Sequence, residues 1–188
     1  MTRLLPSVFC FVALCLAGCG DNRSSVAARP EGGDFVLQSA SGPVDTRALR
    51  GKVLLIYFGY LNCPDICPAS MAAGSQALIA LTPEERAKTK MIMISVDPER
   101  DTLSGLKEYA AFFHPDMIGV TGTAAEIETV AKLFGAGYIR RPPDANGRYA
   151  VDHSAHTYLI DPDGKLAVTI PLGTPTADIV AAIRKHLP

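Results

Sequence analysis

The sequence predicts an α/β fold in which a mixed central sheet is flanked by helices. Runs rich in valine, isoleucine and aromatic residues, typical of strands, alternate with segments whose apolar residues have helical spacing. This alternation is typical of a sheet that is covered on both faces. Near the C-terminus, Asp-Pro-Asp-Gly at 161–164 separates two strand runs, which indicates an added β-hairpin and therefore some antiparallel pairing.

The predicted elements can be placed along the chain from these patterns. The expected strands are residues 34–39, 52–58, 91–96, 117–120, 156–160 and 166–170. The expected helices are residues 69–81, 103–113, 124–134 and 176–187.

The first 18 residues have the features of a signal peptide. Arg3 supplies a positive charge, an apolar stretch follows at 4–16, and small residues precede Cys19. The stretch is shorter than the roughly 20 apolar residues that cross a bilayer. Leu-Ala-Gly-Cys at 16–19 resembles a bacterial lipobox, which implies cleavage before Cys19 and lipidation of its thiol. The alternatives are an ordinary signal peptide or an uncleaved anchor, and each places the remaining chain outside the cytoplasm.

The predicted organisation has three parts: a lipoprotein-type signal peptide at 1–18, a lipidated cysteine with a flexible tether at 19–33, and one domain at 34–188. The tether is small, polar and punctuated by glycine and proline. The whole chain has a net charge of -1 and no basic run. We therefore expect no nucleic-acid partner.

Few of the five cysteines remain available for chemistry. Cys10 and Cys15 leave with the signal peptide, and Cys19 would carry the lipid. Cys63 and Cys67 are then the remaining thiols. A pair this close in sequence closes too small a loop to stabilise a fold much, so a chemical role is favoured over a structural bridge.

The thiol pair follows the predicted strand at 52–58. Sites in open α/β sheets collect at the carboxyl ends of strands. Pro68 suits the first position of a helix, which makes Cys67 the predicted N-cap. Free amides and the helix dipole would then favour its thiolate, the form that attacks disulfides and binds metals. The pair has one more intervening residue than the usual Cys-x-x-Cys redox motif, and the wider spacing suits two sulfurs on one ion. A thiol pair after an early core strand resembles the thioredoxin fold.

A third metal ligand could come from one of four histidines. His114 and His186 lie at the ends of predicted helices and are interpreted as structural. His153 and His156 lie at the start of the strand run at 156–160. Three residues of separation in an extended chain put two side chains on opposite faces, so only one of them is expected to face the thiols. The residues alone do not tell which.

Three motifs occur in order along the chain: Cys-Pro-Asp-Ile-Cys-Pro at 63–68, Ser-Val-Asp-Pro-Glu-Arg-Asp-Thr at 95–102 and Val-Asp-His at 151–153. Together they resemble the signatures of the Sco/SenC family, and the resemblance covers residues 34–187. The resemblance implies a thioredoxin-like fold that binds copper through Cys63, Cys67 and His153. It also implies a role at the copper A site of cytochrome c oxidase subunit II, by delivering copper or by reducing the cysteines of that site.

The donor set is also chemically consistent with copper. Two soft thiolates and one imidazole can hold Cu(I) or Cu(II). A closed structural zinc site would normally want a fourth protein ligand, and none is evident. The second hypothesis is a thiol-disulfide oxidoreductase in which one cysteine attacks a partner disulfide and the other resolves it, so that His153 is dispensable. A thiol peroxidase is disfavoured because the Thr-x-x-Cys arrangement is missing around Cys63.

The acidic segment after the strand at 91–96 lies at the same predicted edge of the sheet. Asp101 or Thr102 is expected to cap the helix that follows. For Asp97 the resemblance implies an accessory role, in orienting the loop or meeting a partner, rather than ligation.

The expected location is the periplasmic side of a bacterial cell envelope, as a membrane-anchored lipoprotein held through Cys19. The expected partners are cytochrome c oxidase subunit II and another periplasmic copper chaperone or a thiol reductant. The adjacent Arg140 and Arg141 are either a contact for an acidic partner or solvated loop charges.

Overall fold

The computed structural model describes residues 30–188, so the predicted signal peptide, Cys19 and most of the tether lie outside the described residues. A five-stranded sheet with the order β5-β4-β3-β8-β9 forms the centre of the domain. Its strands are β3 (Val53–Gly59), β4 (Thr89–Ser95), β5 (Met117–Val120), β8 (Thr157–Ile160) and β9 (Leu166–Ile170). The first three are parallel, whereas β8 and β9 pair antiparallel. The predicted mixed sheet with its C-terminal hairpin is confirmed.

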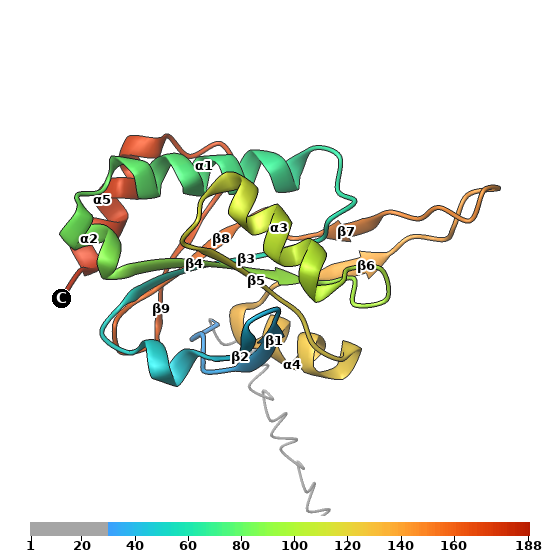
Figure 1. The fold of residues 1–188 in the computed structure, drawn as a ribbon, viewed down its shortest axis with the longest axis horizontal. Helices are drawn as coiled ribbons and strands as arrows, with labels where there is room; N and C mark the ends of the chain where they lie inside the picture. The colour runs from blue at the N-terminus through green and yellow to red at the C-terminus, as the bar shows by residue number, and fades with distance from the viewer. Residues whose placement is uncertain (1–29) are drawn as a thin grey trace, which may run out of the picture.

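Helices cover both faces of the sheet (Figure 1). One face carries α1 (Ile66–Ala80), α3 (Leu103–Phe113) and α5 (Thr176–His186). The opposite face carries α4 (Ala124–Phe134) and the hairpin of β1 (Val36–Ser39) and β2 (Gly42–Asp45). Two short helices, η1 (Thr46–Leu49) and α2 (Pro83–Ala87), connect the larger elements.

The central strand β3 explains why this core forms. Each of its seven residues is buried, as expected for a strand with helices on both faces and neighbours on both sides. It pairs in parallel with β4 from Val53 opposite Thr89 to Gly59 opposite Ser95. The carboxyl ends of the two strands therefore meet at the same edge of the sheet.

The helix after β3 begins earlier than the sequence predicts. Asp65 is the N-cap and Ile66 is the first helical residue. The prediction that Cys67 is the N-cap is therefore wrong, because Cys67 lies inside the first turn and Pro68 is its third residue. Proline is tolerated there because the first amides of a helix have no partner within it. By contrast Thr102 caps α3 as expected, since its side chain accepts a hydrogen bond from the Gly105 amide.

A two-stranded antiparallel hairpin projects from the domain beside the carboxyl end of β3 (Figure 1). Its strands are β6 (Tyr138–Arg140) and β7 (Val151–His153), and we call residues 138–153 the arm. Tyr138 pairs with His153 at the base. The strands were not predicted, because they are only three residues long and the segment between them is exposed and rich in polar residues.

The described end of the predicted tether lies against the domain. The Glu31 carbonyl accepts a hydrogen bond of 2.8 Å from the Leu166 amide, and the Gly32 amide donates one of 3.1 Å to the Leu133 carbonyl. Within residues 30–188, no helix combines the length and the apolar character needed to cross a bilayer.

Candidate metal centre

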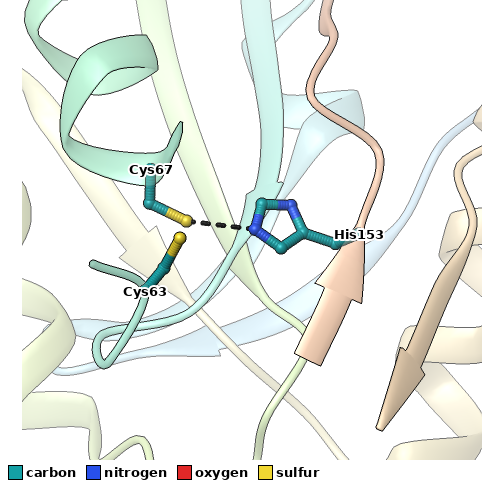
Figure 2. Close-up of side chains that lie close together, drawn as sticks. All are labelled: Cys63, Cys67 and His153. Carbon is teal, nitrogen blue, oxygen red and sulfur yellow. Dashed lines mark hydrogen bonds between the residues drawn. The ribbon is translucent and has the colours of Figure 1, made fainter. Parts of the chain in front are cut away.

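Two segments that are far apart in the sequence bring Cys63, Cys67 and His153 together (Figure 2). Cys63 is half-buried in the loop that follows β3, and Cys67 is fully buried in the first turn of α1. His153 is the last residue of β7 at the base of the arm. The arm therefore supplies the imidazole, while the strand-loop-helix unit supplies both sulfurs.

The geometry of the three side chains fits one metal ion. Their ligand atoms all lie within 4.8 Å of one another. Nε2 of His153 is 3.3 Å from Sγ of Cys67, and Nδ1 is 3.1 Å from the Ser154 carbonyl oxygen (Figure 2). A carbonyl can only accept, so we assign the ring proton to Nδ1. Nε2 then turns its lone pair toward the sulfurs, as a metal ligand must.

Burial keeps the imidazole neutral. The His153 ring makes T-shaped contacts with two aromatic rings, with centroid distances of 6.0 Å to Tyr57 and 5.7 Å to Tyr60. Desolvation lowers the pKa of His153, although a hydrogen bond to the Ser154 carbonyl opposes the shift. A neutral imidazole is the form that binds metal.

The protonation state of Cys67 differs from the prediction, which was that the helix favours its thiolate. Burial raises the pKa of Cys67 to about 12. The desolvation of a fully buried sulfur outweighs the helix dipole. At neutral pH the thiol therefore keeps its proton, and a metal must displace that proton when it binds.

A glycine makes room for the buried sulfur. A Cβ atom on Gly59 would lie 2.7 Å from Sγ of Cys67 and 2.8 Å from Cε1 of Tyr57. Contacts this short do not occur between real atoms of these types, so only glycine fits the end of β3 beside this cysteine. Sequence reasoning missed this residue, because the close approach exists only once the helix packs on the strand.

The acidic turn after β4 lies beside the site, and Asp97 is not in the metal-ligand group. Asp97 is buried and forms an ion pair with Arg100. Asp101 does not cap α3, because its Oδ2 accepts hydrogen bonds of 3.0 Å from the Leu61 amide and 2.7 Å from the Ser95 hydroxyl. The hydrogen bond between Asp101 and the Leu61 amide was not predicted, since the two residues are 40 positions apart in the sequence.

The remaining histidines lie elsewhere. His156 is exposed and precedes β8, and only His153 lies with the two cysteines, so one of these two histidines faces the thiols as expected. Nδ1 of His114 accepts a hydrogen bond of 3.1 Å from the Asp116 amide. His186 is the last residue of α5.

The two adjacent arginines of the arm are exposed and ion-paired within the domain. Arg140 contacts Glu99 at 2.6 Å, and Arg141 contacts Asp152.

Fold and site together define a class of protein. A mixed sheet with two thiols at the start of the first long helix, and an imidazole beside them, is a thioredoxin-like domain with a three-ligand group that could hold a metal. The chain belongs to the SCO1/SenC family, whose family model matches residues 23–188. The predicted thioredoxin-like fold and family are therefore confirmed.

Curated relatives include bacterial and mitochondrial proteins. An SCO2-like protein of Rickettsia conorii is 40% identical over 136 residues, which cover 71% of this chain and 66% of the relative. The mitochondrial SCO2 homolog of Bos taurus is 36% identical over 157 residues, which cover 82% of this chain and 59% of the relative. This chain thus spans about 60 to 66% of the length of these two relatives.

Solved structures share the fold along most of their length. The structure of Bradyrhizobium japonicum ScoI with copper bound has a TM-score of 0.75 and 37% identity, and the match covers 83% of this chain and 99% of that one. BsSco, described as a member of the Sco family of cytochrome c oxidase assembly proteins with a disulfide switch, has a TM-score of 0.67, 31% identity and coverage of 84% and 94%. A SCO1/SenC family lipoprotein of Bacillus anthracis has a TM-score of 0.70, 26% identity and coverage of 84% and 95%.

Proposed function

We propose that this protein is a copper chaperone that binds copper through Cys63, Cys67 and His153. The convergence of two sulfurs and one imidazole nitrogen within 4.8 Å is the observation that carries the proposal. Thiolates select soft ions such as Cu(I), and the imidazole adds a donor that also suits Cu(II). Within the described residues the group has no fourth cysteine, histidine or carboxylate, and three ligands leave a position through which an ion can be passed on. The copper in Bradyrhizobium japonicum ScoI supports the choice of metal.

Copper would be delivered to a cytochrome c oxidase, with subunit II and its copper A site as the recipient. The family membership and the description of BsSco as an oxidase assembly protein support this partner. Another periplasmic copper chaperone or a thiol reductant would load or reduce the site. Transfer of copper from the loaded protein to a copper-free soluble domain of subunit II, followed by the absorption of the copper A site, tests the recipient directly.

The first test is copper binding by the reduced chain. We define the reference protein as the full chain in which serine replaces Cys10, Cys15 and Cys19, so that its two remaining thiols are those of the site. His153→Ala is compared with His156→Ala, which removes an exposed histidine three residues away.

The expected result is one copper per chain in the reference protein and in His156→Ala, with a sulfur-to-copper charge-transfer band for Cu(II). His153→Ala should lose the band or bind far more weakly. Equal binding by the two histidine variants would show that His153 is not the third ligand, and no binding at all would reject the copper site.

A second candidate function, thiol-disulfide exchange, is favoured by the unequal exposure of the two cysteines. Cys63 is half-buried and Cys67 fully buried, which suits an attacking and a resolving thiol. The Cys63 thiolate would attack a partner disulfide and release one partner thiol. Cys67 would then attack the sulfur of Cys63 and release the second, so that the partner gains two electrons and a Cys63–Cys67 disulfide forms. His153→Ala should keep this activity, whereas Cys67→Ser should trap the mixed disulfide.

The site would act on the periplasmic side of a bacterial cell envelope, in a membrane-anchored lipoprotein that is held through Cys19 after cleavage of residues 1–18. The Bacillus anthracis family member, a lipoprotein, supports this anchor. Cell fractionation tests the anchor with a variant in which Cys19 is replaced and export is kept. We expect the unchanged protein in the membrane fraction and this variant in the soluble periplasmic fraction. Retention of that variant in the membrane would contradict a lipid anchor.

A further inference from the structure

One short turn contacts both halves of the site. Residues 97–101 form a turn closed by hydrogen bonds of 3.2 Å and 3.0 Å from the amides of Arg100 and Asp101 to the Asp97 carbonyl. Asp101 binds the Leu61 amide, two residues before Cys63. Its neighbour Arg100 reaches in another direction and binds the arm that carries His153.

Arg100 binds the arm at two places, the backbone carbonyl and the aromatic ring of Tyr149. Its Nη1 donates a hydrogen bond of 2.9 Å to the Tyr149 carbonyl. The guanidinium carbon lies 3.5 Å from the centroid of the Tyr149 ring, within the range of a close cation–π contact. Asp97 holds both the Arg100 guanidinium and the Tyr149 ring in place. It pairs with Nε of Arg100 and accepts a hydrogen bond of 2.8 Å from the Tyr149 hydroxyl.

The other strand of the arm is fastened to the same turn. The guanidinium carbon of Arg140 lies 3.8 Å from the Tyr149 ring centroid. Two guanidinium groups this close to one ring must lie on opposite faces, so Tyr149 is held between Arg140 and Arg100. Arg140 is itself paired with Glu99 of the turn at 2.6 Å. Both strands are thus tied to residues 97–100.

The stack of Arg100, Tyr149 and Arg140 lies close to the metal site. Tyr149 precedes His153 by four residues, and β7 occupies the last three of them. The Tyr60 ring lies between the two regions, with its centroid 5.6 Å from the guanidinium carbon of Arg100 and 5.7 Å from the ring of His153. A shift of the arm at Tyr149 would therefore be transmitted through an extended chain to the imidazole.

We propose that Arg100 is a positioning residue that seats the arm so that His153 meets the two cysteines. The inference rests on the proposed copper function. In it, Arg100 positions His153 and does not position the two cysteines. A planar guanidinium is needed, because it must stack on Tyr149 while donating to the Tyr149 carbonyl and to Asp97, and a lysine ammonium cannot do all three.

The test is a double-mutant cycle in the reference protein that combines Arg100→Met with His153→Ala. Removing groups that orient a metal ligand typically costs about 10- to 100-fold in metal affinity, and we expect Arg100→Met to weaken Cu(II) binding by about that factor. Because the effect passes through His153, Arg100→Met should cause no further loss when His153 is already alanine. Arg148→Met is the matched control, since Arg148 lies on the same arm and, within residues 30–188, its side chain pairs with Asp144 alone.

A second readout needs no copper. In the metal-free protein, Arg100→Met should speed hydrogen exchange of the β6–β7 amides and shift the ring resonances of His153, whereas the rate of Cys63 alkylation should stay unchanged. Arg148→Met should change none of these. If Arg100→Met does not fold, Arg100→Lys takes its place with the same expected directions.

Three results would overturn the inference: Cu(II) affinity unchanged in Arg100→Met, an equal loss with and without His153, or unchanged exchange in the arm. Failure of the proposed function is distinguishable, because the reference protein itself would then bind no copper while the metal-free readout still reports on the arm.

Discussion

Nε2 of His153 lies 3.3 Å from the sulfur of Cys67, while Nδ1 of the same ring is committed to the Ser154 carbonyl. The proton between this pair belongs to the sulfur, because burial raises the pKa of Cys67 and lowers that of His153. In the metal-free protein the thiol therefore donates to the imidazole. An incoming ion replaces one proton and finds both donors already within reach, so little rearrangement is needed for binding.

Copper affinity should rise with pH. The pKa of Cys67 is raised to about 12, so its thiol is protonated at pH 6 to 9 and binding must release that proton. Each proton released makes the affinity about tenfold higher per pH unit, so the Cys67 proton alone gives a rise of at least about tenfold per pH unit. The pKa of His153 is lowered, so it is neutral at pH 7 and adds to the slope only below its ordinary range. Competition with a chelator across this range and further into acid measures the slope, and His153→Ala should lack the acidic steepening. An affinity independent of pH would contradict the assignment.

The two thiols should differ in their reaction with iodoacetamide. In the reduced, metal-free reference protein at pH 8, we expect Cys63 to react at least about ten times faster than Cys67, because Cys67 is fully buried and its raised pKa leaves little thiolate. Mass spectrometry of the peptides over time measures both rates. In denaturant the rates should converge. Equal rates in the folded protein would argue against the unequal roles in disulfide exchange.

The elements with strong local signals could be predicted from the sequence. The apolar run of β3, the thiol pair after it and the Asp-Pro-Asp-Gly turn at 161–164 each carry their own pattern. Thr102 was a predictable cap, because capping depends on neighbours in the chain. These features fixed the sheet and the edge at which the site lies.

The rest depends on contacts between distant residues. The arm has strands of three residues, too short for a periodic pattern. His153 is 86 residues from Cys67, so only the family resemblance could select it over His156. The protonated state of Cys67 follows from how tightly α1 packs on Gly59, and no local pattern reveals that packing.

Gly59→Ala should disturb the buried thiol. The added Cβ would lie 2.7 Å from Sγ of Cys67, so the sulfur or the helix must move. Overpacking of this kind costs about 1–3 kcal/mol of folding stability, and copper affinity should fall with it. Gly137→Ala is the control, because no atom of the described part of the chain lies within 4 Å of the position its Cβ would take. Urea unfolding and copper competition measure the two effects. Wild-type values for Gly59→Ala would mean that the sulfur can move aside without cost.

Asp101→Ala should loosen the loop that carries Cys63. Oδ2 of Asp101 accepts from both the Leu61 amide and the Ser95 hydroxyl, and its removal leaves two polar groups without their partner. Such a loss costs about 1–3 kcal/mol. In Asp101→Asn the single carbonyl oxygen can take the place of Oδ2 and keep both bonds, so we expect most of the stability to return.

Urea unfolding of the metal-free reference protein separates these two variants. Asp163→Ala, which removes an exposed carboxylate from the β8–β9 turn, should leave the unfolding free energy within about 0.5 kcal/mol of the reference. Hydrogen exchange at the Leu61 amide should be fast in Asp101→Ala and slow in Asp101→Asn. If the asparagine variant is as unstable as the alanine variant, the negative charge rather than the shared acceptor oxygen holds this loop, and the two bonds to Oδ2 would not explain its position.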